Sequence, residues 1–332
     1  MYKQLHCLIL LLIGSVCGAP LFAQSNRDLM NPGNDSSINI ISDSVNNSSK
    51  DSLLILKSVS ANKDPLHPKH SYFQAGMEYL SNNVYLGRKD TTVLPYFTTT
   101  VGYYNKSGLF AAASLSYLKN STESRLDLIT MEAGYMLNAG HYEAQLTISK
   151  FFYNSQSTNV SSSITASVAL DNHYDLGPVT LAISGTINMS LKNDFAGQFG
   201  LEHTFYLLND HLDFAPTFTV NASTQNYYND YYLQRKYSIK RKGQVTQTGI
   251  AIITGTVLNA STFKILDYEP SLPVNYTIGK WTIHFTPTYS IPVNPAAVDI
   301  HTVRDNGQVL NKTKTEQLEN SFYWTLGVSI TF

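Results

Sequence analysis

The sequence predicts an all-β fold: a transmembrane, antiparallel, up-and-down β-barrel of about 12 strands. Three observations predict it. Segments of about ten residues alternate apolar and polar side chains, which is the period of a strand with two different faces. The connections between these segments alternate between short turns and longer loops. The last segment ends on an aromatic residue, Phe332, with apolar residues at every second position before it.

Composition agrees with a barrel in a lipid environment. The 332 residues carry a formal net charge of −1, so nothing indicates nucleic-acid binding. Charged residues make up 14% and aromatic residues 12%, with 22 Tyr, whereas a soluble protein usually has about a quarter charged residues. Tyr and Trp suit a surface that is partly lipid and partly water.

Residues 1–23 have the pattern of a secretory signal peptide. Lys3 provides a positive start, residues 5–13 form an apolar run, and residues 21–23 offer a small-residue cleavage site. A membrane-spanning helix needs about 20 apolar residues, and residues 14–20 interrupt this one. An uncleaved anchor is the alternative interpretation.

The two cysteines, Cys7 and Cys17, both lie in this segment. Lipidation of Cys17 is a second alternative, but Val16 stands where lipoprotein signals usually place a small residue. Cleavage after Ala23 would leave a mature chain that cannot form a disulfide or a thiolate metal site.

Residues 24–69 are rich in Ser, Asn and Asp and end near Pro65 and Pro68. Such a segment buries too little apolar surface to offset its ordering entropy, so we expect a flexible periplasmic leader. The role of the short apolar patch at 53–56 stays open. Residues 70–332 form the expected barrel.

Twelve segments fit the strand pattern. In the first, Phe73 and Met77 lie on one face while Gln74 and Glu78 lie on the other. A bilayer-spanning strand needs about 9 to 11 residues, which these segments match. In chain order they are 72–80, 94–104, 109–118, 126–137, 142–153, 161–174, 179–189, 197–208, 212–222, 263–276, 281–291 and 322–332.

The connections give a second, independent indication. Five are short and carry turn residues: 105–108, 138–140, 175–178, 209–210 and 277–279. They alternate with longer connections at 81–93, 119–125, 154–160, 190–196, 223–262 and 292–321. Barrels of the outer membrane have short periplasmic turns and longer extracellular loops. Both termini are then periplasmic and the strand count is even. A soluble β-sandwich, the alternative fold, explains neither regularity.

A closed barrel also satisfies the backbone in hydrocarbon, because every amide finds a partner and no edge remains. The last strand resembles the C-terminal signal of outer-membrane barrels, which the barrel-assembly machinery recognises. Its candidate signal residues are Trp324, Leu326, Val328, Ile330 and Phe332. An ordinary amphipathic strand at a chain end is the alternative.

Four further stretches carry a resemblance. They are Val84-Tyr85-Leu86-Gly87-Arg88, Gly102 to Leu109, Leu266 to Pro273, and Pro287 to Pro292. With them, residues 72–332 resemble porin-like outer-membrane barrel proteins of the Bacteroidota. That group has no well-defined activity, so the resemblance implies a fold and a location in the cell outer membrane.

The expected inner face carries more acids than bases. The lumen-lining candidates are Glu78, Glu132, Glu202, Asp267, Glu269, Lys280 and His284, with Glu143 and Asp213 also on polar faces. An acidic lumen could favour cations or a basic solute. Alternatively, the interior is packed and its carboxylates are hydrogen-bonded, because 12 strands enclose a lumen that side chains can largely fill. Asp267 and Glu269, two apart, are weak grounds for a metal site, so we expect neither a metal nor a cofactor.

The loop 223–262 combines tyrosines with basic residues, which is a common recognition surface. Its candidate binding residues are Tyr227, Tyr228, Tyr231, Tyr232, Arg235, Lys236 and Arg241. Outside the cell the nearest anions are lipopolysaccharide phosphates, which this patch would suit. An aromatic girdle with solvated charge at the barrel rim is the alternative.

Twelve-stranded outer-membrane lipases are the obvious enzyme comparison, but they place a His and a Ser two residues apart on one strand. Here Phe205 follows His203 at that spacing and Thr286 follows His284. The sequence therefore predicts no enzyme, and a lipid hydrolase is disfavoured.

The leading hypothesis is a porin-like, solute-translocating barrel. The alternative is a plugged structural or binding barrel that acts through the loop 223–262. The expected partners are outer-membrane lipid, lipopolysaccharide and the assembly machinery. The openness of the lumen, the solute and the oligomeric state are left open.

Overall fold

The structure is a computed structural model that describes residues 70–121, 124–229, 252–303 and 306–332. The expected signal peptide and leader lie outside these residues. The described strands form three antiparallel sheets: one of 15 strands, one of three and one of two. In the same part of the chain, no helix is both long enough and apolar enough to cross a membrane.

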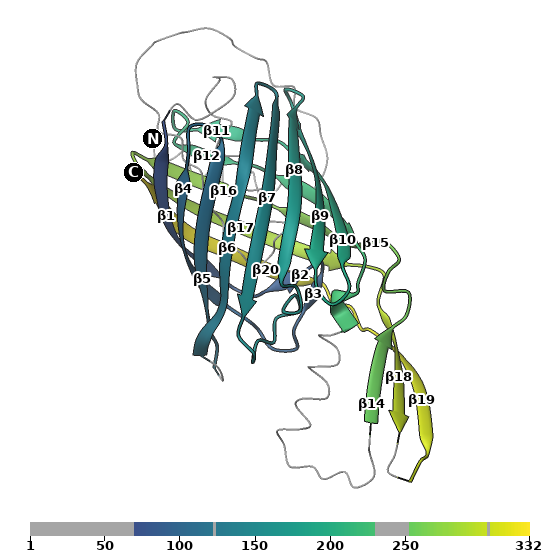
Figure 1. The fold of residues 1–332 in the computed structure, drawn as a ribbon. Helices are drawn as coiled ribbons and strands as arrows, with labels where there is room; N and C mark the ends of the chain where they lie inside the picture. The colour runs from purple at the N-terminus through teal and green to yellow at the C-terminus, as the bar shows by residue number, and fades with distance from the viewer. Residues whose placement is uncertain (1–69, 122–123, 230–251, 304–305) are drawn as a thin grey trace. The chain divides into compact units, whose positions relative to one another are not determined.

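The 15-stranded sheet closes into a barrel with twelve wall positions (Figure 1). Closure is completed by the last strand, β20, which pairs with β17 on one side and with β1 on the other. Nine positions are single strands: β1 (Tyr72–Leu80), β4 (Tyr96–Tyr104), β5 (Leu109–Lys119), β6 (Ser124–Ala139), β7 (Tyr142–Tyr153), β8 (Ala166–Asp175), β9 (Thr180–Met189), β17 (Trp281–Pro292) and β20 (Ser321–Thr331).

The other three positions lie between β9 and β17, and each is a strand interrupted once. They are β10 (Asp194–Glu202) with β11 (Phe205–Leu207), β12 (Leu212–Phe214) with β13 (Thr217–Ser223), and β15 (Lys264–Ser271) with β16 (Val274–Ile278). Pro216 and Pro273 lie at two of the breaks and cannot donate to the ladder. Their carbonyls still accept hydrogen bonds from His203 N (3.2 Å) and Ala215 N (2.9 Å), so pairing continues across the interruption.

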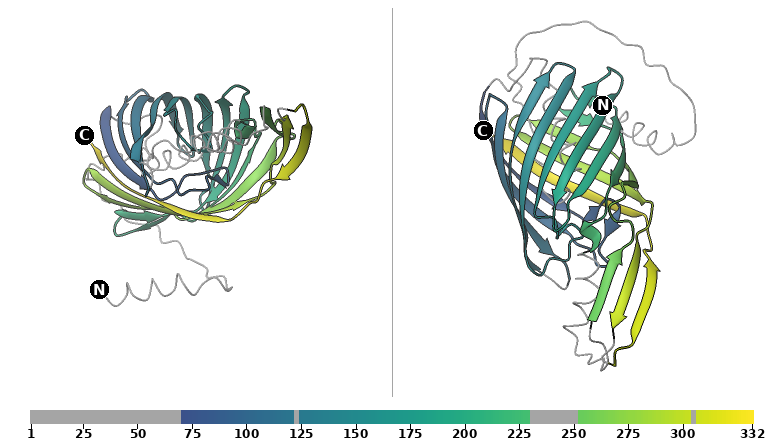
Figure 2. Two further views of the ribbon diagram at one scale, coloured as in Figure 1. Left: turned by 90° about the horizontal axis from the view of Figure 1, so that it is seen from below. Right: turned by 45° about the vertical axis from the view of Figure 1, so that its right-hand side comes forward.

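The register fixes the geometry of the ring. A path that steps from each residue to its paired residue on the next strand goes once around the ring and returns to β1. It returns about 16 residues away from its starting residue, and this displacement is the shear of the barrel. For 12 strands at ordinary spacing, this shear implies a strand tilt of about 45° and a backbone radius of roughly 12 Å. The steep tilt is visible in the right-hand view of Figure 2.

The twelve predicted strands correspond to the twelve wall positions, and 72–80 and 142–153 have the predicted bounds. The sixth begins at Ala166 rather than 161, because the preceding residues turn inward and bury Ile164. Five strands inside the long loops were not predicted: β2 (Val84–Tyr85), β3 (Arg88–Lys89), β14 (Ile252–Val257), β18 (Ala297–Val303) and β19 (Val309–Thr315).

The two faces of the wall have opposite chemistry. Along β4, Phe97 and Val101 point outward and are exposed, whereas Thr98 and Thr100 point inward and are buried. The outer face of β20 likewise presents Leu326 and, just past the strand, Phe332. A soluble protein does not expose an apolar belt of this extent. The outer surface is that of a transmembrane barrel.

Candidate functional site

One end of the barrel, where the long loops meet, is filled by a buried apolar cluster. Its members come from loops and from the adjoining strand ends: Tyr85, Leu86, Leu128, Phe151, Val160, Ile164, Tyr227, Tyr228, Val257, Ala260, Leu266, Ala296 and Val298. We call the loop segments of this cluster, 84–89, 159–164, 224–229, 257–260 and 294–298, the plug. Apolar side chains are usually sparse in solvated loops, and here they form a core of their own.

The β2–β3 hairpin of the plug spans the interior. It follows β1, yet the hydroxyl of Tyr85 accepts a hydrogen bond from Asn188 Nδ2 at 3.1 Å. Asn188 lies on β9, which is the seventh wall position when β1 is the first. In a ring of twelve, these positions are opposite each other. The ring of Tyr85 also packs edge-on against Tyr227 at 5.1 Å. The hairpin therefore reaches from one wall to the other.

The turn of this hairpin requires its own sequence. Leu86 and Gly87 have φ values of 48° and 76°, so both central residues are left-handed, as in a type I′ turn. A Cβ on Gly87 would lie 2.8 Å from Pro292 Cβ and 2.9 Å from Asp267 Cβ. Only glycine fits this contact with β15 and β17.

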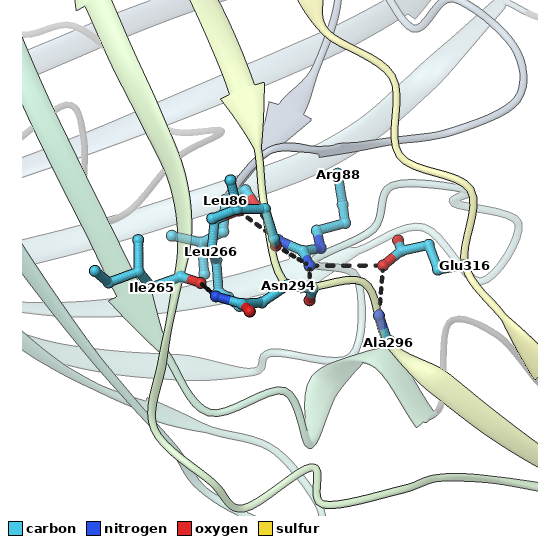
Figure 3. A network of polar contacts seen from close by, with 8 residues as sticks. Leu86, Arg88, Ile265, Leu266, Asn294, Ala296 and Glu316 are labelled. Atoms are coloured by element: carbon cyan, nitrogen blue, oxygen red, sulfur yellow. Dashed lines mark hydrogen bonds and ion pairs between the residues drawn. The ribbon is translucent and has the colours of Figure 1, made fainter.

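Arg88 fastens the hairpin to β15 and to the segment after β17, and Figure 3 shows its contacts. The buried guanidinium donates from Nη1 to the carbonyls of Leu86 and Leu266, both at 2.9 Å. Its Nη2 donates to the carbonyls of Val293 at 3.1 Å and Asn294 at 3.0 Å. One side chain thus joins the hairpin to β15 and to the segment that follows β17.

Glu316 completes this arrangement. Its carboxylate lies 3.5 Å from Arg88 Nη2 and accepts a hydrogen bond from Ala296 N at 3.0 Å. The amide of Glu316 donates to the carbonyl of Ala296 at 2.8 Å, and Asn294 Nδ2 donates to the carbonyl of Ile265 at 2.8 Å (Figure 3). We call Arg88, its four carbonyl partners and Glu316 the latch.

Asp194 holds another segment of the plug. Its carboxylate accepts hydrogen bonds from the amides of Asn226 and Tyr227, both at 2.7 Å, and from Thr224 Oγ1 at 2.6 Å. These bonds cap a helical turn that begins at Tyr227. The segment 224–229 is therefore fixed to the wall at β10.

The tyrosines of the predicted binding loop are placed differently from the prediction. Tyr227 and Tyr228 are 0% and 8% exposed, so their assignment to an exposed binding surface was wrong. Their rings fill the plug instead, and burial raises the pKa of the Tyr227 phenol, which keeps it neutral. The other predicted members of this surface lie outside the described residues: Tyr231, Tyr232, Arg235, Lys236 and Arg241.

Below the plug, the predicted acidic side chains face the interior on hydrogen-bonded positions. Glu269 accepts from Tyr323 Oη at 3.3 Å, and Asp267 accepts from Ser290 Oγ at 3.0 Å. Glu202 accepts from the hydroxyl of Thr217 (3.3 Å), and Glu132 accepts from that of Ser149 (3.0 Å). The interior is polar and largely hydrogen-bonded.

His284 and Glu78 meet at the seam where the barrel closes. His284 Nε2 lies 3.1 Å from Glu78 Oε2. Both residues pair with Gly327 of β20, and a Cβ on that glycine would lie 2.2 Å from His284 Cε1. The imidazole therefore lies across Gly327 to reach the first strand, and this contact depends on the missing side chain.

Lys280 was predicted to line the lumen, and this placement was wrong. It lies in the turn between β16 and β17 and is exposed. Gly279, the residue before it, has a φ of 59°, so the chain turns there and the alternation of inward and outward side chains stops. The next strand begins only at Trp281. A period-two pattern extended through a turn assigns the wrong face.

No group of three or more His, Cys, Asp or Glu side chains that could hold a metal occurs among the described residues. His203 bonds through Nδ1 to the carbonyl of Pro178 and packs against Phe205. His284 is engaged with Glu78 as described above.

The sequence carries a signal for the plug. The run Val84-Tyr85-Leu86 is apolar, although it lies in a connection that was expected to be solvated. Arg88 directly follows its turn. Apolar residues in a predicted outer loop indicate a second buried surface, and a nearby arginine is suited to satisfying buried carbonyls.

No known protein-family profile matches the chain, and no curated protein matches it. Among solved structures, it is similar to a bacterial polysaccharide outer membrane secretin, with 10% identity over 80% of this chain and 99% of that chain and a TM-score of 0.35. It is also similar to the Acinetobacter baumannii outer membrane protein Omp33 (10% identity, 80% and 99% covered, TM-score 0.29). A refined porin shows 11% identity, 79% and 99% coverage and a TM-score of 0.28. These likenesses are too distant to bear on function, and the fold rests on the strand pairing of this chain.

Proposed function

We propose that this chain is an integral outer-membrane barrel that translocates a solute and is closed at rest by the plug. The observation that carries the proposal is the β2–β3 hairpin, which crosses the interior to reach β9 and is fastened by Arg88 to β15 and to the segment after β17. A loop lies across the interior, and its buried Arg88 guanidinium donates hydrogen bonds to four carbonyls, so closure is built into the fold.

The apolar outer face supports insertion into a bilayer, and the alternation of turns and loops supports the outer membrane with the plug on the outer side. The signal peptide, the periplasmic leader and the likeness to Bacteroidota barrels belong to this proposal. So do contacts with outer-membrane lipid and lipopolysaccharide. The assembly machinery would recognise the last strand through residues that face outward from it: Trp324, Leu326, Val328, Ile330 and Phe332.

The inner wall favours translocation over a purely structural role. A core that serves stability alone is best filled with apolar side chains in close packing. Between the plug and the turn end, the inward positions are instead polar, as with Thr100, Ser114 and Thr147. Polar linings of this kind accompany passage of water and polar solutes. At the seam, the Glu78 carboxylate is paired with His284, so this part of the polar lining carries no isolated charge.

A plugged binding barrel is the second candidate, and the extent of the buried plug favours it. Its expected recognition surface no longer includes Tyr227 and Tyr228, because both are buried. A binding role would therefore use other parts of the loops. A lipid hydrolase remains disfavoured by its missing His and Ser pair.

Recording currents across planar bilayers distinguishes these functions. The purified wild-type chain is compared with a variant in which 84–89 is replaced by a Gly-Ser linker of equal length. We expect almost no conductance steps from the wild type and frequent steps from the variant. Frequent steps from the wild type would contradict closure at rest. Silence from both proteins, with folding confirmed, would favour the binding barrel.

A further inference from the structure

Accessibility varies along the inner wall. Most inward side chains are buried, as for Gln74 and Thr130. Among the inward positions of intermediate exposure, three adjoin each other on β5 and β6: Ala112, Glu132 and Gly134. Ala112 pairs directly with Glu132 across β5 and β6, and Gly134 is the next inward residue on β6. We call these three residues the accessible strip.

Glu132 is the charged member of the strip. Its carboxylate accepts one hydrogen bond, from Ser149 Oγ at 3.0 Å. Within the described part of the chain it forms no ion pair, in contrast to Glu78, which has His284 at 3.1 Å. A partly buried carboxylate on an inner wall needs a counter-charge or water.

Polar groups beside the strip have bonding capacity to spare. Both side-chain polar atoms of Gln74 are buried without a hydrogen-bond partner among the described residues. The same holds for the hydroxyl of Thr130, the inward neighbour of Glu132, and for Oε1 of Gln145 on β7. Buried polar groups in folded proteins are almost always satisfied by protein, water or ligand. Thr130 is the inward neighbour of Glu132 and Gln74 lies in the same row of paired residues, so this part of the wall has bonding capacity for a polar guest.

An aromatic ladder borders the strip on its other side. The rings of Tyr72 and Tyr104 stack at 4.9 Å with an 11° interplanar angle, and Tyr104 and Phe110 stack at 5.7 Å with 18°. Phe110 ends the ladder over Gly134, where a Cβ would lie 2.6 Å from its Cε1. Carboxylate and aromatic groups side by side suit an organic cation, which has a charged head and an apolar body.

We infer that the accessible strip binds a small organic cation, with its ammonium group on the Glu132 carboxylate and its carbon chain along Phe110. The inference rests on the proposed function in treating this ligand as the translocated solute. The side-chain amides and hydroxyls nearby would bond the remaining polar groups of the guest. An anion is excluded from this wall by the charge of Glu132 itself.

Isothermal titration calorimetry on the full chain in detergent tests the site with three probes of equal length. These are 1,4-diaminobutane, 1,4-butanediol and succinate, which differ only in charge and polarity. We expect saturable binding of the diamine and none of the diol or succinate. The variant Glu132→Gln keeps the shape and should weaken diamine binding by about tenfold or more. The control Glu143→Gln removes another inward carboxyl, one that is hydrogen-bonded to Asn138, and should bind like the wild type.

Three results would overturn the inference: no diamine binding to the wild type, equal binding by Glu132→Gln, or equal loss in both variants. Equal loss would mean a diffuse acidic field instead of a site. The titration is an equilibrium measurement that does not require the plug to open. Its failure is therefore distinguishable from failure of the proposed closure, which the bilayer recordings report independently. A thermal unfolding curve for each variant confirms that the barrel is intact.

Discussion

Replacing Arg88 by Met should open the plug without leaving a large cavity. The aliphatic part of the side chain is kept, while the donors to four carbonyls and the ion pair with Glu316 are lost. Breaking one side of a buried, hydrogen-bonded charge pair typically costs about 3 to 5 kcal/mol. The individual bonds do not add, because the freed carbonyls gain water once the plug loosens.

A loss of this size shifts the equilibrium between closed and open plug by about 10²- to 10⁴-fold. The wild type should conduct in rare, brief events, and Arg88→Met should conduct for a large share of the time. A second readout is chemical. In a chain that begins at residue 24, and so lacks Cys7 and Cys17, the side chain of Tyr85→Cys is shielded in the plug and should react slowly with a maleimide. The added Arg88→Met change should make it react quickly.

Lys89 offers the matched control. It is the next residue on β3, and its ammonium lies 3.6 Å from the Glu319 carboxylate with both side chains accessible. Exposed pairs of this kind contribute only about 0 to 1 kcal/mol. Lys89→Met should therefore conduct and label like the wild type. Equal behaviour of the two variants in both assays would refute the latch.

Three further substitutions test the plug, the seam and the terminal signal. Gly87→Ala should raise conductance, because a Cβ at this position would lie within 3 Å of atoms on β15 and β17. Gly140→Ala is the control: Gly140 also has a positive φ, but a Cβ there would meet open space, so its conductance should match that of the wild type. Gly327→Ala should displace the imidazole at the seam and lower stability by about 1 to 3 kcal/mol, seen as a lower thermal midpoint by circular dichroism, and an unchanged midpoint would argue against that contact. Phe332→Ala should slow assembly in cells. It should leave the stability of the refolded barrel nearly unchanged, because the Phe332 side chain is 63% exposed. The control is Phe322→Ala, which removes a side chain on the same face that is 62% exposed, and it should assemble normally.

The barrel wall was predictable because its signal is local. Alternation within a segment such as 142–153 reports which face is buried, whatever strand lies beside it, and the turn at 138–140 reports the direction of the chain. The strand interruptions were not visible, since a proline such as Pro216 weakens one hydrogen bond without disturbing the apolar pattern. Lys280 was misplaced for a related reason: alternation has no meaning inside a turn.

The plug was out of reach because its contacts are long-range. The bonds of Arg88 join residues 178 to 206 positions apart, and no periodic pattern links them. The same limit applied to Tyr227 and Tyr228, whose composition suits a recognition surface and a buried core equally well. Only the fold shows that their rings face Tyr85. Loops that leave separate strands are brought together by closure of the ring, and that closure depends on all twelve strands.

The position of the latch bears on how the barrel could open. Asn294 lies three residues before β18 begins, and Glu316 directly follows the end of β19. Arg88 therefore holds both roots of the β18–β19 hairpin at once, and the mutual hydrogen bonds of Ala296 and Glu316 keep these roots together. A displacement of either root removes acceptors from the guanidinium and leaves it buried and underbonded, which is costly. The hairpin and the plug are thus coupled through one side chain. A barrel that needed only permanent closure could have used apolar contacts alone, whereas a charged group bonded mainly to carbonyls can be released when those carbonyls move.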